Sequence, residues 1–209
     1  MVNTVPDPPE SFDAVVEHLD PGTRLHRVHS NTRTVTEFNP GIGSRTRFGF
    51  FGDPIVPVLY AADTPEAAVA ETLLHDVPIV GGKLPYAHYA DKVMGLMEIT
   101  RSVRLASLRG LGLRRLKVEA RQDTDASEYS RTVRWAQAAH AAGYDGLAWT
   151  SRQCDDTRAV VLFGDRCGRA VTQDPSFARI FQSGPGLDWL IAICAPLHVD
   201  VMPPSGLNG

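Results

Sequence analysis

The sequence predicts an α+β fold in a single compact domain, with mixed sheets and flanking helices. A chain of 209 residues, 43% hydrophobic and 22% charged, suits one domain and can bury roughly 70% of its unfolded surface. Segments with strand character and segments with helical character intermix without the strict βαβ rhythm of a doubly wound sheet. The sequence shows no internal repeat and no low-complexity tract.

Turn residues and caps define the elements of the N-terminal part. The motif PDPPE predicts a mobile lead-in. Residues 11–19 are expected to form a short helix, capped by Ser11 and closed by a Pro-Gly pair. Residues 24–29 predict a strand. The polar stretch over 30–54 is rich in glycine, hydroxyl residues and arginine, and a loop of that length in a compact domain is usually functional or disordered.

The elements that follow alternate between strands and helices. Residues 58–62 predict a strand, and Thr64-Pro65 begins a helix that extends to about residue 75, with threonine as N-cap and proline at the first helical position. A second helix over 130–142 ends at Gly143 in the C′ position. Further strands are expected over residues 95–100, 103–106, 144–150 and 159–164.

The region beyond residue 170 predicts a polar loop, then an apolar segment over 187–195 that is expected to pack on the core as a terminal helix. We therefore divide the chain into three parts. They are a lead-in with a short helix (1–23), a central domain (24–169) and a C-terminal extension packed on that domain or at an interface (170–209).

Composition excludes several classes of protein. A formal net charge of −3 gives no electrostatic footprint for direct nucleic-acid binding. No apolar run reaches the roughly 18 residues that a membrane span requires, and the first 20 residues lack the order of a signal peptide. We expect a cytoplasmic protein without a membrane partner. Three scattered cysteines fit neither a disulfide framework nor a CxxC metal site.

Glu71 is the residue least easily explained by structure alone. The predicted helix carries apolar residues on nearly every face, so it is expected to be buried, and a buried carboxylate costs several kcal/mol without a partner or a task. The alternative is a structural role, in which Glu71 pairs with a buried arginine or reaches solvent through a gap in the packing.

Two arginines are candidates for anion binding. Arg27 lies in a strand rich in arginine and histidine, which forms either a solvated edge or the wall of an anion site. Arg47 lies among three phenylalanines in the loop GSRTRFGFFG, a combination that suits a ligand with a phosphate and a flat ring, although an ordinary surface loop has the same composition.

Tyr60 and Ser151 complete the set of candidates. Tyr60 precedes Glu71 by eleven residues, so a strand and the following helix can bring both side chains to one pocket. Ser151 follows the strand GYDGLAWT, where no GxSxG motif supports a hydrolase elbow. His26 and His29 have HxxH spacing but point to opposite sides of a strand, so no metal site is predicted.

In this order and spacing, the residues resemble the RES-domain family over about residues 24–166. The most specific fragment is LYAADTPEAAVAE, followed by YDGLAWTSRQ and AVVLFG. The family name records an arginine, a glutamate and a serine, which here are Arg27 or Arg47, Glu71 and Ser151. Many relatives have a glycine before the loop arginine, whereas Thr46 precedes Arg47 here, so Arg45 remains an alternative.

The resemblance implies an ADP-ribosyltransferase-like fold with a cleft between two small sheets, and a toxin of a bacterial toxin–antitoxin pair. Such toxins destroy NAD⁺ by hydrolysis or phosphorolysis of the nicotinamide–ribose bond, with NAD⁺ as substrate and no metal or cofactor. The implied roles are catalytic for Arg27, Glu71 and Ser151, and substrate-binding for Arg47 and Tyr60. The implied partner is a helix-turn-helix antitoxin.

Two other functions remain open at this stage. An ADP-ribosyltransferase would use the same site with a macromolecular acceptor, although many arginine-modifying enzymes carry an acidic residue where Val69 stands. A non-catalytic binding module would keep the fold without turnover, although all five candidate positions hold chemically competent residues.

Overall fold

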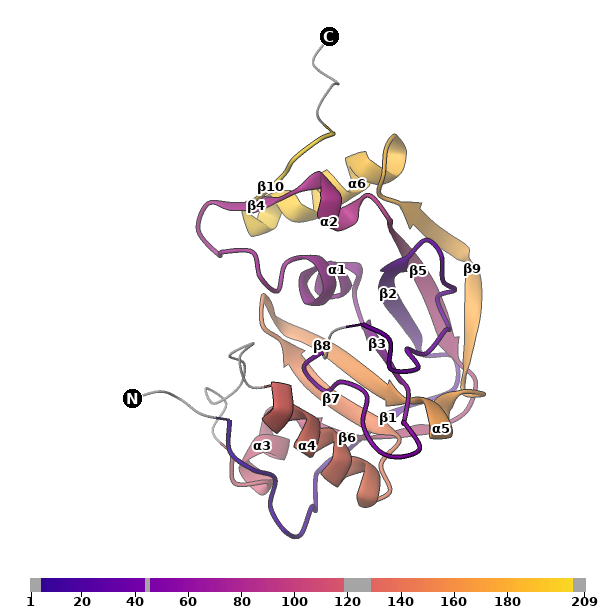
Figure 1. Ribbon diagram of the computed structural model, residues 1–209, viewed down its shortest axis with the longest axis vertical. Coiled ribbons are helices and arrows are strands. Elements are labelled where there is room, and N and C mark those ends of the chain that lie inside the picture. Colours follow the sequence, from indigo (N-terminus) through magenta and orange to yellow (C-terminus); the bar gives the residue numbers. More distant parts are fainter. Residues whose placement is uncertain (1–4, 44–45, 119–128, 205–209) are drawn as a thin grey trace.

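The strands form one eight-stranded mixed sheet and a separate two-stranded parallel ladder, β10–β4 (Figure 1). This computed structural model describes residues 5–43, 46–118 and 129–204. The strands are β1 (Val16–Leu19), β2 (Arg24–Ser30), β3 (Val58–Ala62), β4 (Gly82–Leu84), β5 (Lys92–Ile99), β6 (Val103–Leu108), β7 (Gly146–Ser151), β8 (Cys154–Phe163), β9 (Val171–Ile180) and β10 (Val199–Val201). The large sheet has the order β1-β6-β7-β8-β3-β2-β5-β9, in which β6 and β7 run parallel.

Helices cover this sheet and its ends, which confirms the predicted α+β class. They are α1 (Pro65–Leu73), α2 (Tyr86–Tyr89), α3 (Leu111–Arg115), α4 (Tyr129–Ala141), α5 (Gly164–Cys167) and α6 (Pro185–Cys194), followed by a 3₁₀ turn at Ala195–Leu197. Among the described segments, no helix is long and apolar enough to cross a membrane.

The sheet is almost divided between β2 and β3. These neighbours share a single register pair, His26↔Ala62, whereas β2 pairs with β5 along its whole length and β3 pairs with β8 along its whole length. In Figure 1 the half β2-β5-β9 stands at an angle to the half that contains β6, β7 and β8. The two small sheets expected from the resemblance are therefore two halves of one sheet.

Helix α1 spans this division. It contacts β2 from one half and β3, β7 and β8 from the other. Its start follows the sequence prediction, since Thr64 is the N-cap, its hydroxyl oxygen accepts from Ala67 N at 3.3 Å, and Pro65 occupies the first turn. Apolar clusters lie on both faces of the central strands, so Tyr60 and Val58 face α1 while Leu59 and Ala61 face the other cluster.

The prediction of a helix over residues 11–19 is wrong. Val16–Leu19 instead form β1, which pairs antiparallel with Val103–Ala106 at the edge of the sheet. A nine-residue helix is marginal by itself. Here the pairing with β6, and the hydrogen bond of Ser107 Oγ to Glu17 Oε1 at 2.6 Å, stabilise the extended form.

The lead-in is fixed rather than mobile from Val5 onward. The indole Nε1 of Trp135 donates to Pro6 O at 2.8 Å, and Arg134 pairs with Asp7 at 2.7 Å. Val5 is buried. Prolines here favour an extended segment that lies along α4, a contact that composition does not reveal.

The prediction of a polar loop after residue 170 is also wrong. Val171–Ile180 form β9, an edge strand that pairs with β5 and contains a register shift opposite Gly95 and Leu96. An edge strand tolerates Pro175 and many exposed side chains, which explains why its sequence resembles a loop. The apolar segment that follows forms α6 and packs on the core through Leu187, Leu190 and Cys194, as predicted.

Candidate active site

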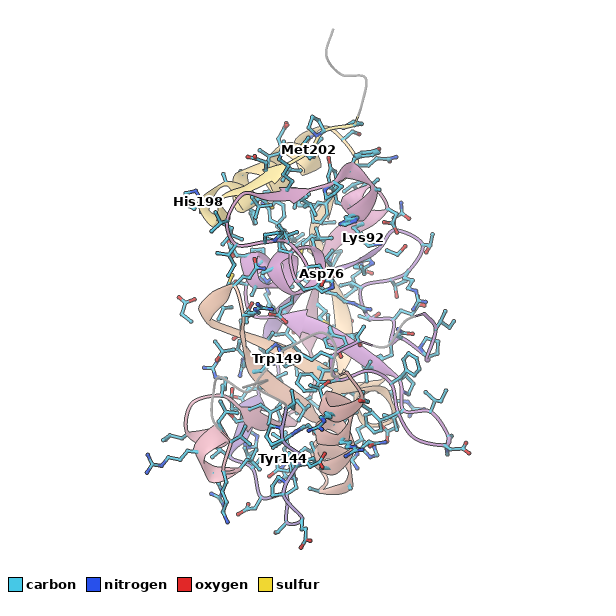
Figure 2. All side chains as sticks on the ribbon, turned by 60° about the vertical axis from the view of Figure 1, so that its left-hand side comes forward. Asp76, Lys92, Tyr144, Trp149, His198 and Met202 are labelled. Carbon is cyan, nitrogen blue, oxygen red and sulfur yellow. The ribbon has the colours of Figure 1, made fainter. Side chains whose placement is uncertain are left out.

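A cavity of about 810 Å³ opens where β2 and β3 diverge. Its walls come from β2, β3, α1, the loop after β2 and the end of β7. Trp149 and Asp76, which both contribute to its lining, lie in the central part of the molecule (Figure 2). Four of the five predicted residues line this cavity, namely Arg27, Arg47, Tyr60 and Glu71.

Glu71 projects from α1 and is held by two neutral donors. The indole Nε1 of Trp149 donates to Oε2 at 3.1 Å, and the backbone N–H of Arg152 donates to Oε1 at 3.2 Å. In the part of the chain that the structure describes, no basic side chain forms an ion pair with this carboxylate within 4 Å. Among the residues that the structure describes, two neutral donors and not a buried arginine hold Glu71.

Tyr60 connects β3 to the glycine-rich loop. Its hydroxyl accepts from Phe48 N at 2.8 Å and lies 3.0 Å from Thr46 Oγ1. Burial is the largest cause that raises the pKa of Tyr60 to about 12, so the phenol stays protonated at physiological pH. The ring packs edge-on against Trp149 at 6.0 Å between centroids. Its hydroxyl thus holds the segment on both sides of Arg47.

Arg47 lies beside aromatic rings. Its Cζ is 5.2 Å from the centroid of Phe48 and 5.6 Å from the ring of Trp149, both within cation–π range. Its carbonyl accepts a hydrogen bond from the Thr132 hydroxyl of α4. The alternative loop arginine, Arg45, lies outside the described residues.

Arg27 also lines the cavity. It lies on the face of β2 that carries Leu25, opposite to the face on which Val28 packs in the same cluster as α1. Its Nη1 donates to Val35 O and to Glu37 O, both at 2.7 Å. Burial lowers the pKa of its guanidinium to about 10, which leaves it charged at neutral pH. Its charged neighbours are Glu37 and Arg33, so Arg27 belongs to a different part of the cavity from Glu71.

Ser151 does not line the cavity. It is the last residue of β7, its side chain is fully buried, and within the described chain its Oγ has no hydrogen-bond partner. The residues on either side reach the site instead, since Trp149, Arg152 and Gln153 all contribute to the lining. The structure therefore places the residues around Ser151, rather than its hydroxyl, at the cavity.

The cavity is basic. Four arginines line it (Arg27, Arg33, Arg47 and Arg152) against two carboxylates, Glu71 and Asp76. Trp149, Arg33 and Arg152 are cavity residues that the sequence patterns did not predict. Trp149 lies in the fragment YDGLAWTSRQ and could have been found as the large polar-tipped side chain two positions before Ser151. The roles of Arg33 and Arg152 depend on loop positions that carry no periodic signal.

His26 and His29 also line the cavity, and burial is the largest cause that lowers the pKa of each. Over the described ranges, no group of three or more histidine, cysteine, aspartate or glutamate side chains is arranged to hold a metal ion.

Comparison with known proteins gives a family and a fold. The family model of the RES domain matches residues 24–182. A chain of the crystal structure of the M. tuberculosis MbcT-MbcA toxin–antitoxin complex is similar, with a TM-score of 0.55 and 13% identity, over 77% of this chain and 85% of that one. The sequence matches none of the curated proteins compared with it.

Proposed function

Because the chain belongs to the RES-domain family, we propose that it is a toxin-like enzyme that cleaves the nicotinamide–ribose bond of NAD⁺ by hydrolysis or phosphorolysis. The observation that supports this proposal most is the environment of Glu71. Its carboxylate is oriented by two neutral donors at the wall of a cavity that four arginines line.

The bond to be broken needs cation stabilisation more than acid catalysis. Nicotinamide leaves with the electron pair of the C1′–N bond and becomes neutral, so no proton has to reach it. The ribose meanwhile acquires oxocarbenium character, as in other glycosyl transfers. We assign Glu71 to stabilise that charge or to hold the attacking acceptor, whose oxygen bonds to C1′. When the acceptor is water, its proton passes to the solvent; a phosphate dianion attacks through an unprotonated oxygen.

The arginines suit the rest of the substrate. NAD⁺ carries two phosphates, and guanidinium groups bind phosphate oxygens with paired hydrogen bonds. Arg47, whose guanidinium lies beside the rings of Phe48 and Trp149, is in the same part of the cavity as Glu71 and is our first candidate for a diphosphate contact. Arg27 holds the loop after β2 through hydrogen bonds from Nη1. We therefore propose that it both fixes the shape of the diphosphate site and adds positive charge to it.

Tyr60 and Ser151 have more indirect roles in this proposal. The Tyr60 hydroxyl is bonded to the loop, which leaves its ring to form part of the cavity wall. Because the Ser151 hydroxyl is fully buried, direct contact with nicotinamide or ribose requires a shift of the turn that follows β7. A catalytic role for Ser151 therefore depends on such a shift of the turn.

A protein partner is also part of the proposal. The similar chain comes from a structure described as a toxin–antitoxin complex, which supports an antitoxin partner for this chain. We propose a helix-turn-helix protein in that role. Coexpression with the product of an adjacent gene, followed by size-exclusion chromatography, tests it.

The reaction is tested by incubating the protein with NAD⁺, with and without inorganic phosphate, and separating the products by chromatography. Nicotinamide with ADP-ribose indicates water as the acceptor, whereas a phosphorylated ADP-ribose that requires added phosphate indicates phosphorolysis. Label from NAD⁺ that ends on macromolecules would support an ADP-ribosyltransferase instead. No consumption of NAD⁺ at high protein concentration would support a binding module.

A further inference from the structure

We infer that Trp149 is the positioning residue for Glu71, through the hydrogen bond from its indole nitrogen. This inference rests on the proposed function. The observation behind it is that one of the two donors to the carboxylate is a side chain, 78 residues away in sequence and on a different element. The other donor is a backbone N–H, which no substitution at that position removes except proline.

The surroundings of Trp149 fix the direction of that N–H. The side chain is only 1% exposed. The Phe48 ring lies 5.0 Å away and the Tyr60 ring 6.0 Å away, and the guanidinium of Arg47 lies over the indole. A ring enclosed in this way has one rotamer, so its N–H points at one place. A glutamate side chain, by contrast, has three rotatable bonds and loses orientation without such a contact.

The donor is also neutral, which matters for the proposed chemistry. An arginine in this position would orient the carboxylate equally well but would offset its charge. The indole and the backbone N–H orient both oxygens and add only dipoles, so the negative charge of Glu71 remains available to a cationic ribose.

The test is Trp149→Phe, which keeps an aromatic ring in the enclosed space and removes the donor. We expect kcat for NAD⁺ cleavage to fall about tenfold, the size expected for one lost hydrogen bond to a charged group. KM should change little, because the lost hydrogen bond orients Glu71 and not the bound substrate. A purely structural role for Trp149 would instead lower the unfolding free energy and leave kcat of the folded variant at the wild-type value.

Trp135→Phe is the matched control. Trp135 is also buried and its indole N–H also forms one hydrogen bond, but to Pro6 O beside α4. Trp135→Phe should keep the wild-type kcat. If the Trp149 variant has the same kcat as wild type, or changes KM alone, Trp149 does not act through Glu71 and the inference is wrong.

A second measurement does not require the Trp149 variant to fold. The chain has three tryptophans, so three indole N–H resonances are expected in a ¹⁵N-labelled sample. The Trp149 resonance should shift in Glu71→Gln while the Trp135 resonance stays in place. An unshifted Trp149 resonance would overturn the inference. This readout needs no turnover, so it separates failure of the inference from failure of the proposed reaction.

Discussion

The hydroxyl of Tyr60 links the central sheet to the loop that carries Arg47. It accepts a hydrogen bond from the Phe48 N–H and is hydrogen-bonded to the Thr46 hydroxyl, so both neighbours of Arg47 are anchored to β3. The high pKa of about 12 follows from burial and keeps the phenol neutral over the pH range in which the enzyme would be assayed. At the scale of single residues, Tyr60 therefore positions another side chain more than it presents its own polar group.

Tyr60→Phe should raise KM for NAD⁺ several-fold with a smaller change in kcat, because the loop around Arg47 loses its attachment. The unfolding free energy should fall by about 1–2 kcal/mol, since the Phe48 N–H loses its acceptor. Steady-state kinetics and urea unfolding measure the two effects.

Tyr144→Phe is the control for this prediction. The Tyr144 hydroxyl also forms two hydrogen bonds, both to the backbone of Ala14 and remote from the cavity. It should lose comparable stability and keep the wild-type KM. Equal KM values for wild type and the Tyr60 variant would contradict the proposed role of Tyr60.

At the scale of elements, the start of α1 is held by Arg158 of β8. Its guanidinium contacts both oxygens of Asp63 at 3.0–3.2 Å and reaches Glu17 of β1 at 3.3 Å. Asp63 immediately precedes the N-cap of the helix that carries Glu71. The position of the candidate catalytic carboxylate thus depends on a charge network outside the cavity.

Arg158→Lys should lower the unfolding free energy by about 2 kcal/mol, because lysine keeps the charge but loses the paired geometry in a side chain that is 18% exposed. Urea unfolding at neutral pH measures it. Arg24→Lys is the comparison, since Arg24 contacts Asp174 from a side chain that is 62% exposed and should change stability by less than about 0.5 kcal/mol. Equal losses in the two variants would show that the paired contact at Asp63 adds nothing.

The single register pair between β2 and β3 places His26 at the junction of the two half-sheets. Burial is the main reason that its pKa lies below 6.5 in the folded protein. The unfolded chain therefore takes up a proton first as the pH falls below 6.5, and the folded state loses stability there. His29 adds to the same trend.

We expect the unfolding free energy to decrease between pH 7.5 and pH 5.5, and to decrease less in His26→Gln than in wild type. Urea unfolding of both proteins at the two pH values gives the comparison. The carboxylates contribute equally to the decrease in both proteins, so their effect cancels in the difference. An identical decrease in both proteins would show that burial does not lower the pKa of His26 in the folded protein.

At the scale of the whole molecule, local signals in the sequence predicted much of the central fold. β2, β3, α1 and α4 lie close to their expected ranges because each has a local cap, turn or apolar pattern. β1 and β9 were missed because they are sheet edges, whose stability comes from partners far away in sequence. For the same reason, spacing brought Tyr60 and Glu71 together but could not show that Trp149 lies between the two.

The C-terminal part is structurally continuous with the large sheet. β9 pairs with β5, and Phe181, Leu190 and Cys194 are fully buried. A chain ending at residue 169 should therefore fail to unfold cooperatively in urea, whereas the full-length protein should unfold in one cooperative transition. Cooperative unfolding of the shorter chain would show that residues 170–209 form a dispensable extension.

The most direct test of the central claim compares nicotinamide release by wild type, Glu71→Gln and Glu66→Gln. Glu66 lies on the same helix and is exposed, so it controls for the chemical change. We predict release by wild type and Glu66→Gln, and a loss of about a thousandfold in a folded Glu71→Gln protein. Undiminished release by folded Glu71→Gln, or no release by wild type, would contradict the assignment of this cavity as an NAD⁺-cleaving site.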